Sequence, residues 1–412
     1  MACPTVFDAF HTATEALGPE LYRIATFKSI MLNLIPRGDF PQGKGTTQTV
    51  FTLGNSQPVD DEPAWDAISL NSLADTADYG LCNPTWNDAY FGYLSETYAP
   101  ERFPIRGPVL CKDDLYFHHN VDAFLQGYVE ELAKYSEAVI QNRLEAKYRS
   151  LVPHYCCNSS FAQDLTYTDA GEGTIVGIGQ ATSELTQEML DTVAAQLIYD
   201  RATEPDSNGF VSLSSVGPLF SLYIGMEASN RIDKNNSEFR LDIRDAQASL
   251  LMDRIGAKRM IKNFRHIVRV TPPRFSYDVG TDTYTRVPTW ANDASVTDGT
   301  AQKLNPNYMD KTTAPYELAL VLSPHVMTEE LIDPDSVVGG VQFDNTNYFG
   351  KWHFVTGNDA IGTETGCFDP LHKRGRHFAE YMHGIKPGSN KKAGAAIMYK
   401  RCPISPTEAL CS

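Results

Sequence analysis

The chain has 412 residues, of which 42% are hydrophobic and 21% charged, and its formal net charge at pH 7 is −16. This apolar content is enough for a sizeable core, and with the plentiful aromatic residues it excludes an intrinsically disordered chain. The acidic balance argues against a nucleic-acid reader, because such proteins neutralise phosphates with lysine and arginine. The sequence shows no secretory signal and no apolar run near the ~18 residues that span a bilayer, so we expect a soluble protein made in a cytoplasm.

Charged residues are segregated along the sequence. Between positions 45 and 101 there are nine acidic residues and no lysine or arginine. Between 254 and 274 there are seven basic residues and no acid, and in 373–401 eight basic residues are opposed only by Glu380. This segregation favours contacts between copies of the chain, because complementary charge sets register and partner choice. Unrelated solvated faces are the alternative interpretation.

The first third of the chain is expected to hold an arm and a hairpin. Residues 1–35 are expected to form an N-terminal arm, with a short helix followed by an apolar run. The segment 46–53 is rich in β-branched and aromatic residues, which indicates a strand, and a second extended piece is expected at 65–70. This glycine-rich hairpin has little apolar content, which favours packing on another subunit as much as on its own domain. Residues 80–117 are expected to be irregular, with short strands.

A long helix over 121–150 is the clearest predicted element. Apolar residues recur there at intervals of three and four, and the opposite face is charged. Asp122 in the first turn and Arg149 in the last turn match the helix dipole, and Pro153 ends the helix. Its length of about 45 Å is far above that of an average helix.

The remaining sequence predicts a mixture of helices and strands. Helices are expected at 187–202, with Thr186 as the N-cap, at 218–230 and at 245–256. The stretch 276–313 is polar and is expected to be a long loop. Strands are expected at 266–270, 316–322, 351–357 and 395–401.

No motif names a reaction. Cys367, His372, His377 and His383 are residue types that bind zinc, but their spacing fits no zinc finger or protease, and the nearby basic residues repel a cation. A metal-dependent hydrolase that uses these four residues stays as an alternative function. The glycine-rich segment 171–179 lacks the spacing of a phosphate-binding loop and indicates a turn, a strand and a turn. The eight cysteines are scattered, and we expect reduced, mostly buried thiols.

The order of these elements resembles that of the major capsid proteins of tailed bacteriophages, which share the Hong Kong 97 fold. The segments Tyr316–Pro324 and Gly375–Arg401 are similar in character to parts of that family. The resemblance implies an α+β fold. It would consist of an N-terminal arm (1–35), an extended β-hairpin loop (36–80), a peripheral domain (81–175 and 315–412) with the spine helix 121–150 and the closing strands, and an axial domain (176–314).

The resemblance also implies a function. The chain would self-assemble into hexamers and pentamers of an icosahedral phage head that encloses double-stranded DNA, with no enzyme activity and no cofactor. Its partners would be copies of itself, portal, scaffolding or decoration proteins, and packaged DNA contacted non-specifically at the inner face, but no membrane. It would be located in the virion, after assembly in the host cytoplasm. A virion structural protein of different fold is a further alternative.

Contacts between copies are expected to pair the acids at 60–66 with the basic segment 254–274 or 373–401 of a neighbour. The resemblance implies that Lys44, at the predicted hairpin tip, would sit where the family prototype has its cross-linking lysine, but the sequence shows no matching acid and asparagine, so no cross-link is expected. The contact candidates are Lys44, Asp60, Asp61, Glu62, Asp66, Arg254, Lys258, Arg259, Lys262, Arg265, Lys373, Arg374 and Arg376.

Overall fold

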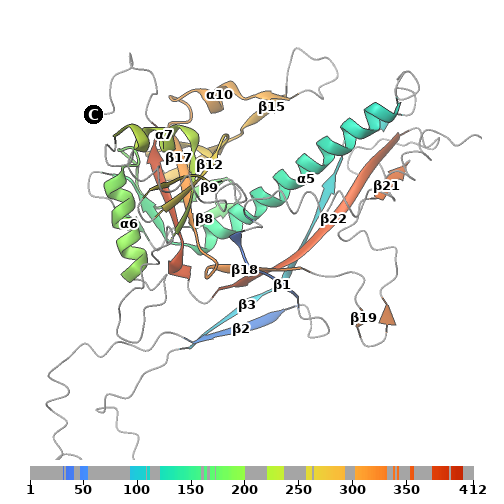
Figure 1. The fold of residues 1–412 in the computed structure, drawn as a ribbon, viewed down its shortest axis with the longest axis horizontal. Helices are drawn as coiled ribbons and strands as arrows, with labels where there is room; N and C mark the ends of the chain where they lie inside the picture. The colour runs from blue at the N-terminus through green and yellow to red at the C-terminus, as the bar shows by residue number, and fades with distance from the viewer. Residues whose placement is uncertain are drawn as a thin grey trace, which may run out of the picture.

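The structure is a computed structural model with two parts, a lobe built on a large sheet and an arm that contains a long helix and a long strand (Figure 1). No helix in the part of the chain that it describes is long and apolar enough to cross a membrane. The described residues are 31, 34–40, 47–53, 93–107, 109–111, 121–158, 162–164, 168–171, 173–199, 220–235, 257–261, 264–292, 302–331, 337–338, 341–342, 353–356, 374–388 and 391–401.

Strand β17 (Tyr316–Leu322) is the centre of the lobe. All seven of its residues are buried, as expected for a strand covered on both faces. It pairs antiparallel with β10 (Phe220–Gly225), β13 (Arg274–Asp278) and β23 (Ala395–Lys400). The other strands of this eleven-stranded sheet are β6 (His154–Cys156), β7 (Ala162–Asp164), β8 (Thr168–Gly171), β9 (Thr174–Val176), β11 (Ala257–Ile261), β12 (Phe264–Arg269) and β14 (Thr283–Val287).

Two helices lie on the side of the lobe away from the arm (Figure 1). Helix α6 (Gln187–Tyr199) is capped by Thr186, whose hydroxyl accepts a hydrogen bond from the amide of Met189 at 3.3 Å. Its apolar face is buried in the core of the lobe. Helix α7 (Met226–Asn235) follows β10 directly. Smaller elements of the described chain are α10 (Pro306–Met309), η2 (Lys391–Ala393), and the strand pairs β15 (Trp290–Asn292) with β16 (Gln302–Leu304) and β19 (Val337–Val338) with β20 (Val341–Gln342).

The arm is formed by helix α5 (Val121–Leu151) and a six-stranded sheet centred on β22 (Arg374–Pro387). Tyr128 of α5 packs against the ring of His377 on β22, with ring centroids 5.1 Å apart, so the two long elements lie side by side. The other strands of this sheet are β1 (Arg37–Asp39), β4 (Pro100–Arg106), β5 (Leu110–Cys111), β18 (Met327–Leu331) and β21 (His353–Thr356).

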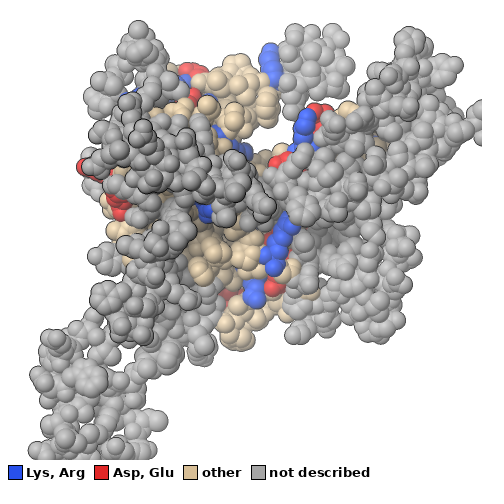
Figure 2. Space-filling model, viewed as in Figure 1, with Lys and Arg blue, Asp and Glu red and all other residues tan. Residues whose placement is uncertain are grey.

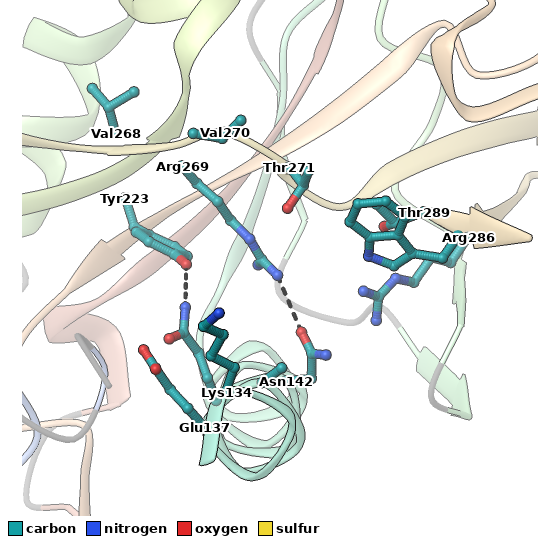
Figure 3. A pocket seen from close by; sticks show the side chains of 13 residues that line it. Lys134, Glu137, Asn142, Tyr223, Val268, Arg269, Val270, Thr271, Arg286 and Thr289 are labelled. Atoms are coloured by element: carbon teal, nitrogen blue, oxygen red, sulfur yellow. Dashed lines mark hydrogen bonds between the residues drawn. The ribbon is translucent and has the colours of Figure 1, made fainter. Parts of the chain in front are cut away.

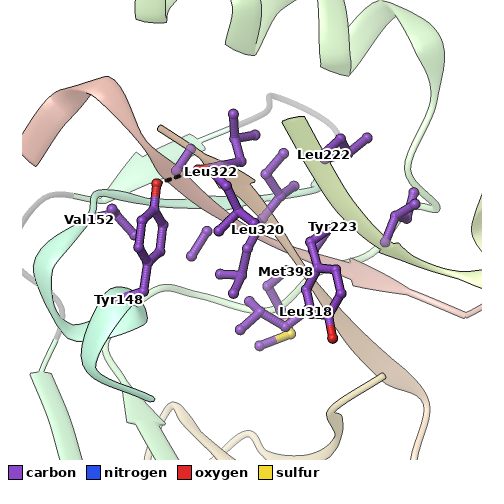
Figure 4. Close-up of a cluster of buried hydrophobic side chains, with 14 of the residues drawn as sticks. Tyr148, Val152, Leu222, Tyr223, Leu318, Leu320, Leu322 and Met398 are labelled. Atoms are coloured by element: carbon purple, nitrogen blue, oxygen red, sulfur yellow. Dashed lines mark hydrogen bonds between the residues drawn. The ribbon is translucent and has the colours of Figure 1, made fainter. Parts of the chain in front are cut away.

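The C-terminal end of α5 is anchored in the core of the lobe (Figure 4). Ile140, Leu144 and Tyr148 are fully buried there. The Tyr148 hydroxyl donates a hydrogen bond to the carbonyl of Val321 at 2.7 Å and accepts one from the amide of Ser323 at 2.9 Å. Helix α5 therefore belongs to the arm at one end and to the lobe at the other.

A two-stranded ribbon projects beside the arm (Figure 1). Strand β2 (Gln48–Leu53) pairs antiparallel with β3 (Tyr93–Tyr98) along six residues. At its base, the Tyr98 hydroxyl donates a hydrogen bond to Glu330 of β18 at 2.5 Å. Phe51, on β2, is 70% exposed. The ribbon is thus tied to the arm at one end and presents an apolar side chain to solvent further along.

Several sequence predictions are confirmed. The α+β class, the long helix, the helix that begins at Gln187 and the strands expected at 266–270, 316–322, 351–357 and 395–401 are present. The glycine-rich segment does form a turn, a strand and a turn, with Gly177 and Gly179 at positive φ. The helix expected at 245–256 and the extended piece expected at 65–70 lie outside the described residues.

Other predictions are wrong. Residues 220–225 form strand β10 rather than the start of a helix, because this run of six buried residues packs inside the sheet. The stretch 276–313 contains β13, β14, β15, β16 and α10. The β13–β14 hairpin has the composition of a polar loop, and its pairing with β17 and β9 buries Phe275 and Tyr284 in the core. The partner of β2 is Tyr93–Tyr98, which comes later in the chain than the hairpin predicted from the sequence.

Candidate functional site

A cavity of about 580 Å³ lies where α5 meets the lobe (Figure 3). Polar residues of one face of α5 form its floor, because residues three, four and seven apart share a helix face. The end of β12 and the start of β15 form the opposite wall. The lining residues on which the description below depends are Gln141, Asn142, Tyr223, Arg269, Arg286 and Trp290.

Arg269 joins the two walls of the cavity. Its guanidinium forms an ion pair with the buried Glu145 of α5 and donates a hydrogen bond to Asn142 Oδ1 at 3.1 Å. It also lies 5.6 Å from the ring centroid of Tyr223. Burial alone would lower the pKa of Arg269, but the charge of Glu145 outweighs burial and raises it. This pair therefore fixes β12 to α5.

Arg286 lines the same cavity and is half-buried. It forms no ion pair with any residue that the structure describes. Burial and the neighbouring charge of Arg269 lower its pKa, whereas the carboxylate of Glu145, already paired with Arg269, raises it. An arginine keeps its proton at any ordinary pH. The guanidinium of Arg286 therefore places in the cavity a positive charge that Glu145 does not neutralise, and Glu137 is the acid among the lining residues.

A second cluster of charges is buried inside the lobe. Glu317 of β17 accepts a hydrogen bond from Arg274 Nε at 2.9 Å and one from the Tyr399 hydroxyl at 2.8 Å, and Arg401 Nε lies 3.3 Å from it. Burial raises the pKa of Glu317 although the two arginines lower it. A Cβ at Gly225 would lie 2.6 Å from Oε2 of Glu317, so only glycine fits beside the cluster. This cluster is fully enclosed and closes the sheet around β17.

Two acids of the run 45–101 are paired with bases of the same chain along the arm. Glu101 of β4 forms ion pairs with Arg143, at 3.1 Å, and with Lys147, both on α5. Glu96 of β3 pairs with Lys391. On the face that Figure 2 shows, basic and acidic side chains lie next to one another. Part of the segregation of charge in the sequence is thus used inside one subunit.

The structure describes some of the predicted contact residues. Arg265 of β12 donates a hydrogen bond to Ser221 Oγ at 2.9 Å. Arg374 is exposed at the start of β22 and Arg376 is half-buried two residues later. Lys258 and Arg259 lie on β11. The remaining candidates, which lie outside the described residues, are Lys44, Asp60, Asp61, Glu62, Asp66, Arg254, Lys262 and Lys373.

The structure does not bring two of the four predicted metal ligands together. His377 and His383 are six residues apart on β22, which separates them by about 20 Å. His383 Nδ1 lies 2.9 Å from Glu329, and His377 Nδ1 lies 3.1 Å from the Tyr128 hydroxyl. Burial lowers the pKa of His377 to about 4.

The other two expected ligands, Cys367 and His372, lie outside the described residues, and within the described ranges no group of three or more histidine, cysteine or acidic residues could hold a metal ion. Cys156 and Cys157 are free thiols and buried, as expected, and burial raises the pKa of Cys156 to about 11.

Sequence reasoning missed the cavity residues. Arg269 belongs to a basic run that was assigned to subunit contacts, but its partner Glu145 is 124 residues away in the sequence. Arg286 and Trp290 lie in the stretch predicted to be a loop. The run Thr283–Val287 is rich in β-branched residues and contains a tyrosine, and this strand signal could have located the first of these.

Comparisons with known proteins give structural matches alone. No protein-family model and no curated protein matches the sequence. The capsid of Ralstonia phage GP4 is similar with 10% identity and a TM-score of 0.46, covering 91% of this chain and 89% of that one. The capsid of cyanophage Pam1 has 8% identity and a TM-score of 0.43, covering 87% and 86%. The acid-stable capsid of Helicobacter pylori bacteriophage KHP30 has 11% identity and a TM-score of 0.43, covering 91% and 92%. The three are phage capsids.

Proposed function

We propose that this chain is a major capsid protein, many copies of which form the hexamers and pentamers of an icosahedral phage head that encloses double-stranded DNA. The observation that carries the proposal is the long arm formed by α5 and the sheet around β22. Helix α5 has 31 residues and β22 has 14, so both are about 46 Å long, and they lie side by side. Such an arm gives a long perimeter for contacts with neighbours, whereas an enzyme that encloses a small substrate has no need of it.

The ribbon β2–β3 supports a role in assembly. A two-stranded ribbon is marginally stable by itself, and the exposed Phe51 adds an apolar surface that favours a covering partner. In the resemblance to the capsid family, this ribbon is the base of the extended loop. Because β3 is its returning strand, the extended loop in our proposal continues to Tyr98 instead of ending at residue 80.

The proposed domains follow from the two sheets. The six-stranded sheet and α5, as the spine helix, would form the peripheral domain. The lobe would contain the axial domain, 176–314, but its eleven-stranded sheet also includes β17 and β23 from the closing segment. The axial domain is therefore proposed to share its core with the closing strands, and the N-terminal arm is proposed for residues 1–35.

Assembly would depend on repetition of weak contacts. Each copy makes the same contacts with its neighbours, and closed symmetry multiplies them, so that no single contact has to be strong. The net charge of −16 suits an inner face that holds packaged DNA without binding it tightly. Portal, scaffolding or decoration proteins would be further partners, and the protein would be located in the virion after assembly in the host cytoplasm.

The test is assembly of the chain expressed alone and with its neighbouring phage genes, followed by negative-stain electron microscopy and sedimentation velocity. We expect closed shells or rings of capsomer size. Phe51→Ser should reduce their yield, because the ribbon loses its apolar contact. Val279→Ser, a matched change at a side chain that is 74% exposed in the turn between β13 and β14, should leave the yield unchanged.

Two results would contradict the proposal. A homogeneous monomer in both expressions, at high concentration, would exclude a shell-forming subunit. Equal yields for wild type, Phe51→Ser and Val279→Ser would exclude the ribbon as a contact between copies.

A further inference from the structure

The cavity between α5 and the lobe contains an arginine, Arg286, that has no ion-pair partner among the described residues. The side chain of Arg286 extends from β14 into the cavity, next to Thr289 (Figure 3), and Trp290 lines the same cavity. Glu137 is the acidic residue that lines the cavity, and it lies at the opposite end from Arg286 in Figure 3. The two other bases of the cavity have acidic partners. Arg269 is paired with Glu145, and Lys134 with Glu131 at 2.6 Å. Arg286 forms no ion pair with a residue in the described ranges, so an incoming anion would meet an unneutralised guanidinium.

Two exposed apolar side chains also line the cavity, and an occupant that fits the cavity has to cover them. Trp290 is 54% exposed and Val270 is 77% exposed, and both line the cavity. A simple anion would pair with Arg286 and leave these two side chains in water. An occupant that matches the whole cavity therefore combines a carboxylate with neighbouring apolar side chains.

One segment of this chain has that composition. The acidic run at 45–101 contains nine acids, of which Glu96 and Glu101 are paired within the subunit, so seven remain. Four of the seven fall within VDDEPAWDAISL, residues 59–70, where acids alternate with valine, proline, tryptophan and isoleucine. The segment also contains no base, so its acids have no partner nearby in the sequence.

The segment would come from a second copy rather than from the same one. It follows β2, and in Figure 1 the ribbon β2–β3 lies on one side of β18, whereas α5 and β15, which line the cavity, lie on the other. From Leu53 to Asp60 there are seven residues, which span at most about 25 Å when extended. The same segment of a neighbouring subunit can reach the cavity without passing around β18.

We infer that the cavity is a docking site for the acidic segment 60–66 of a second copy of this chain, with one carboxylate paired to Arg286 and apolar side chains of the segment covering Trp290 and Val270. The inference rests on the proposed function, because it requires contacts between copies. It differs from the contacts expected from the sequence, since Arg286 belongs to neither of the two basic runs.

The experiment measures binding of a fluorescein-labelled peptide, residues 57–70, to the purified full-length chain before assembly, by fluorescence anisotropy. The wild-type chain should bind it, and Arg286→Gln should bind it at least ~10-fold more weakly, because truncating one partner of a desolvated charge pair is costly. Arg286→Lys should restore most of the affinity. Lys392→Gln, an exposed residue of η2 outside the cavity, is the charge-matched control and should bind like wild type. Arg286→Gln should unfold at the wild-type temperature, since Arg286 has no described acidic partner to leave unpaired.

Two further arms identify the source of the anion. A peptide with Asp60, Asp61, Glu62 and Asp66 replaced by their amides should not bind, and inorganic phosphate should compete only weakly. The inference is overturned if Arg286→Gln binds the peptide as tightly as wild type, if the amide peptide binds equally well, or if phosphate occupies the Arg286 site without displacing the peptide.

Binding and shell formation are separate readouts. Shells without peptide binding would remove the docking site and leave the proposed function standing. Peptide binding that depends on Arg286, in a chain that never forms shells, would support the site and contradict the capsid proposal.

Discussion

Replacing Glu145 by glutamine tests how the lobe is attached to α5. Glu145 is buried, and both of its carboxylate oxygens accept hydrogen bonds from Arg269 of β12. Glutamine keeps the size of the side chain and removes its charge. The guanidinium of Arg269, whose side chain is 15% exposed, would then lie next to Arg286 without its acidic partner.

The expected loss in the free energy of unfolding is about 3 kcal/mol. Breaking a buried ion pair by removing one partner costs about 3–5 kcal/mol. The lower end applies here, because Arg269 keeps its hydrogen bond to Asn142 at 3.1 Å and because part of its side chain reaches water. The double variant Glu145→Gln/Arg269→Met should regain part of the loss, since it leaves no buried charge behind.

Urea unfolding of the unassembled chain, followed by circular dichroism, measures the effect. Glu131→Gln is the matched control on the same helix, where an exposed glutamate is paired with the exposed Lys134. That substitution should cost less than about 0.5 kcal/mol, because exposed ion pairs contribute little. Losses that agree within about 1 kcal/mol for the two single variants would refute the view that the Glu145–Arg269 pair holds the lobe to α5.

Two further predictions concern acid and glycine. Burial lowers the pKa of His377 to about 4 and of His154 to about 3, so the unfolded chain binds these protons first as the pH falls below about 6.5. Stability should therefore be intact above pH 6.5 and fall as the pH drops to 4, and His377→Gln should make the measured slope less steep; an unchanged slope would contradict this assignment. Gly225→Ala should destabilise the chain by about 1–3 kcal/mol, because its Cβ would meet Glu317 at 2.6 Å, whereas Gly127→Ala, with no atom within 4 Å, should stabilise α5 by about 1 kcal/mol. Equal thermal unfolding temperatures for the two glycine variants would contradict both assignments.

Elements with strong local signals could be predicted from the sequence. The apolar stripe of 121–150 repeats over eight turns, which is the pattern of a helix. The run 316–322 is apolar except for Glu317, and it fits a strand buried on both faces. Residues 220–225 were ambiguous, because a short apolar run has no period that separates a buried strand from a buried helix. The glycine and proline before it resembled a helix start, and pairing with β12 and β17 decided in favour of the strand.

The candidate site could not be predicted, because its walls come from distant parts of the chain. Glu145 and Arg269 are 124 residues apart, and Arg286 reaches the cavity from a hairpin that reads as polar loop. The distribution of charge along the sequence therefore does not show which basic residues are free to contact another subunit. Arg269 and Arg274 belong to the same basic run, and both are paired with acids of their own subunit, Glu145 and Glu317.

Under the proposed function, helix α5 gives the fold a property that a shell would require. Near its start, Tyr128 packs against β22, and in its second half Arg143 pairs with Glu101 of β4. Its last turns are held in the lobe by the Glu145–Arg269 pair and by the hydrogen bonds of Tyr148 to β17 and Ser323. One continuous helix thus contacts both sheets and fixes their relative orientation. In a closed assembly every copy repeats the same contacts, so an error in the angle between lobe and arm would be multiplied around the shell. Loss of the Glu145–Arg269 pair should therefore alter the curvature and size distribution of particles as well as lower the stability of the subunit.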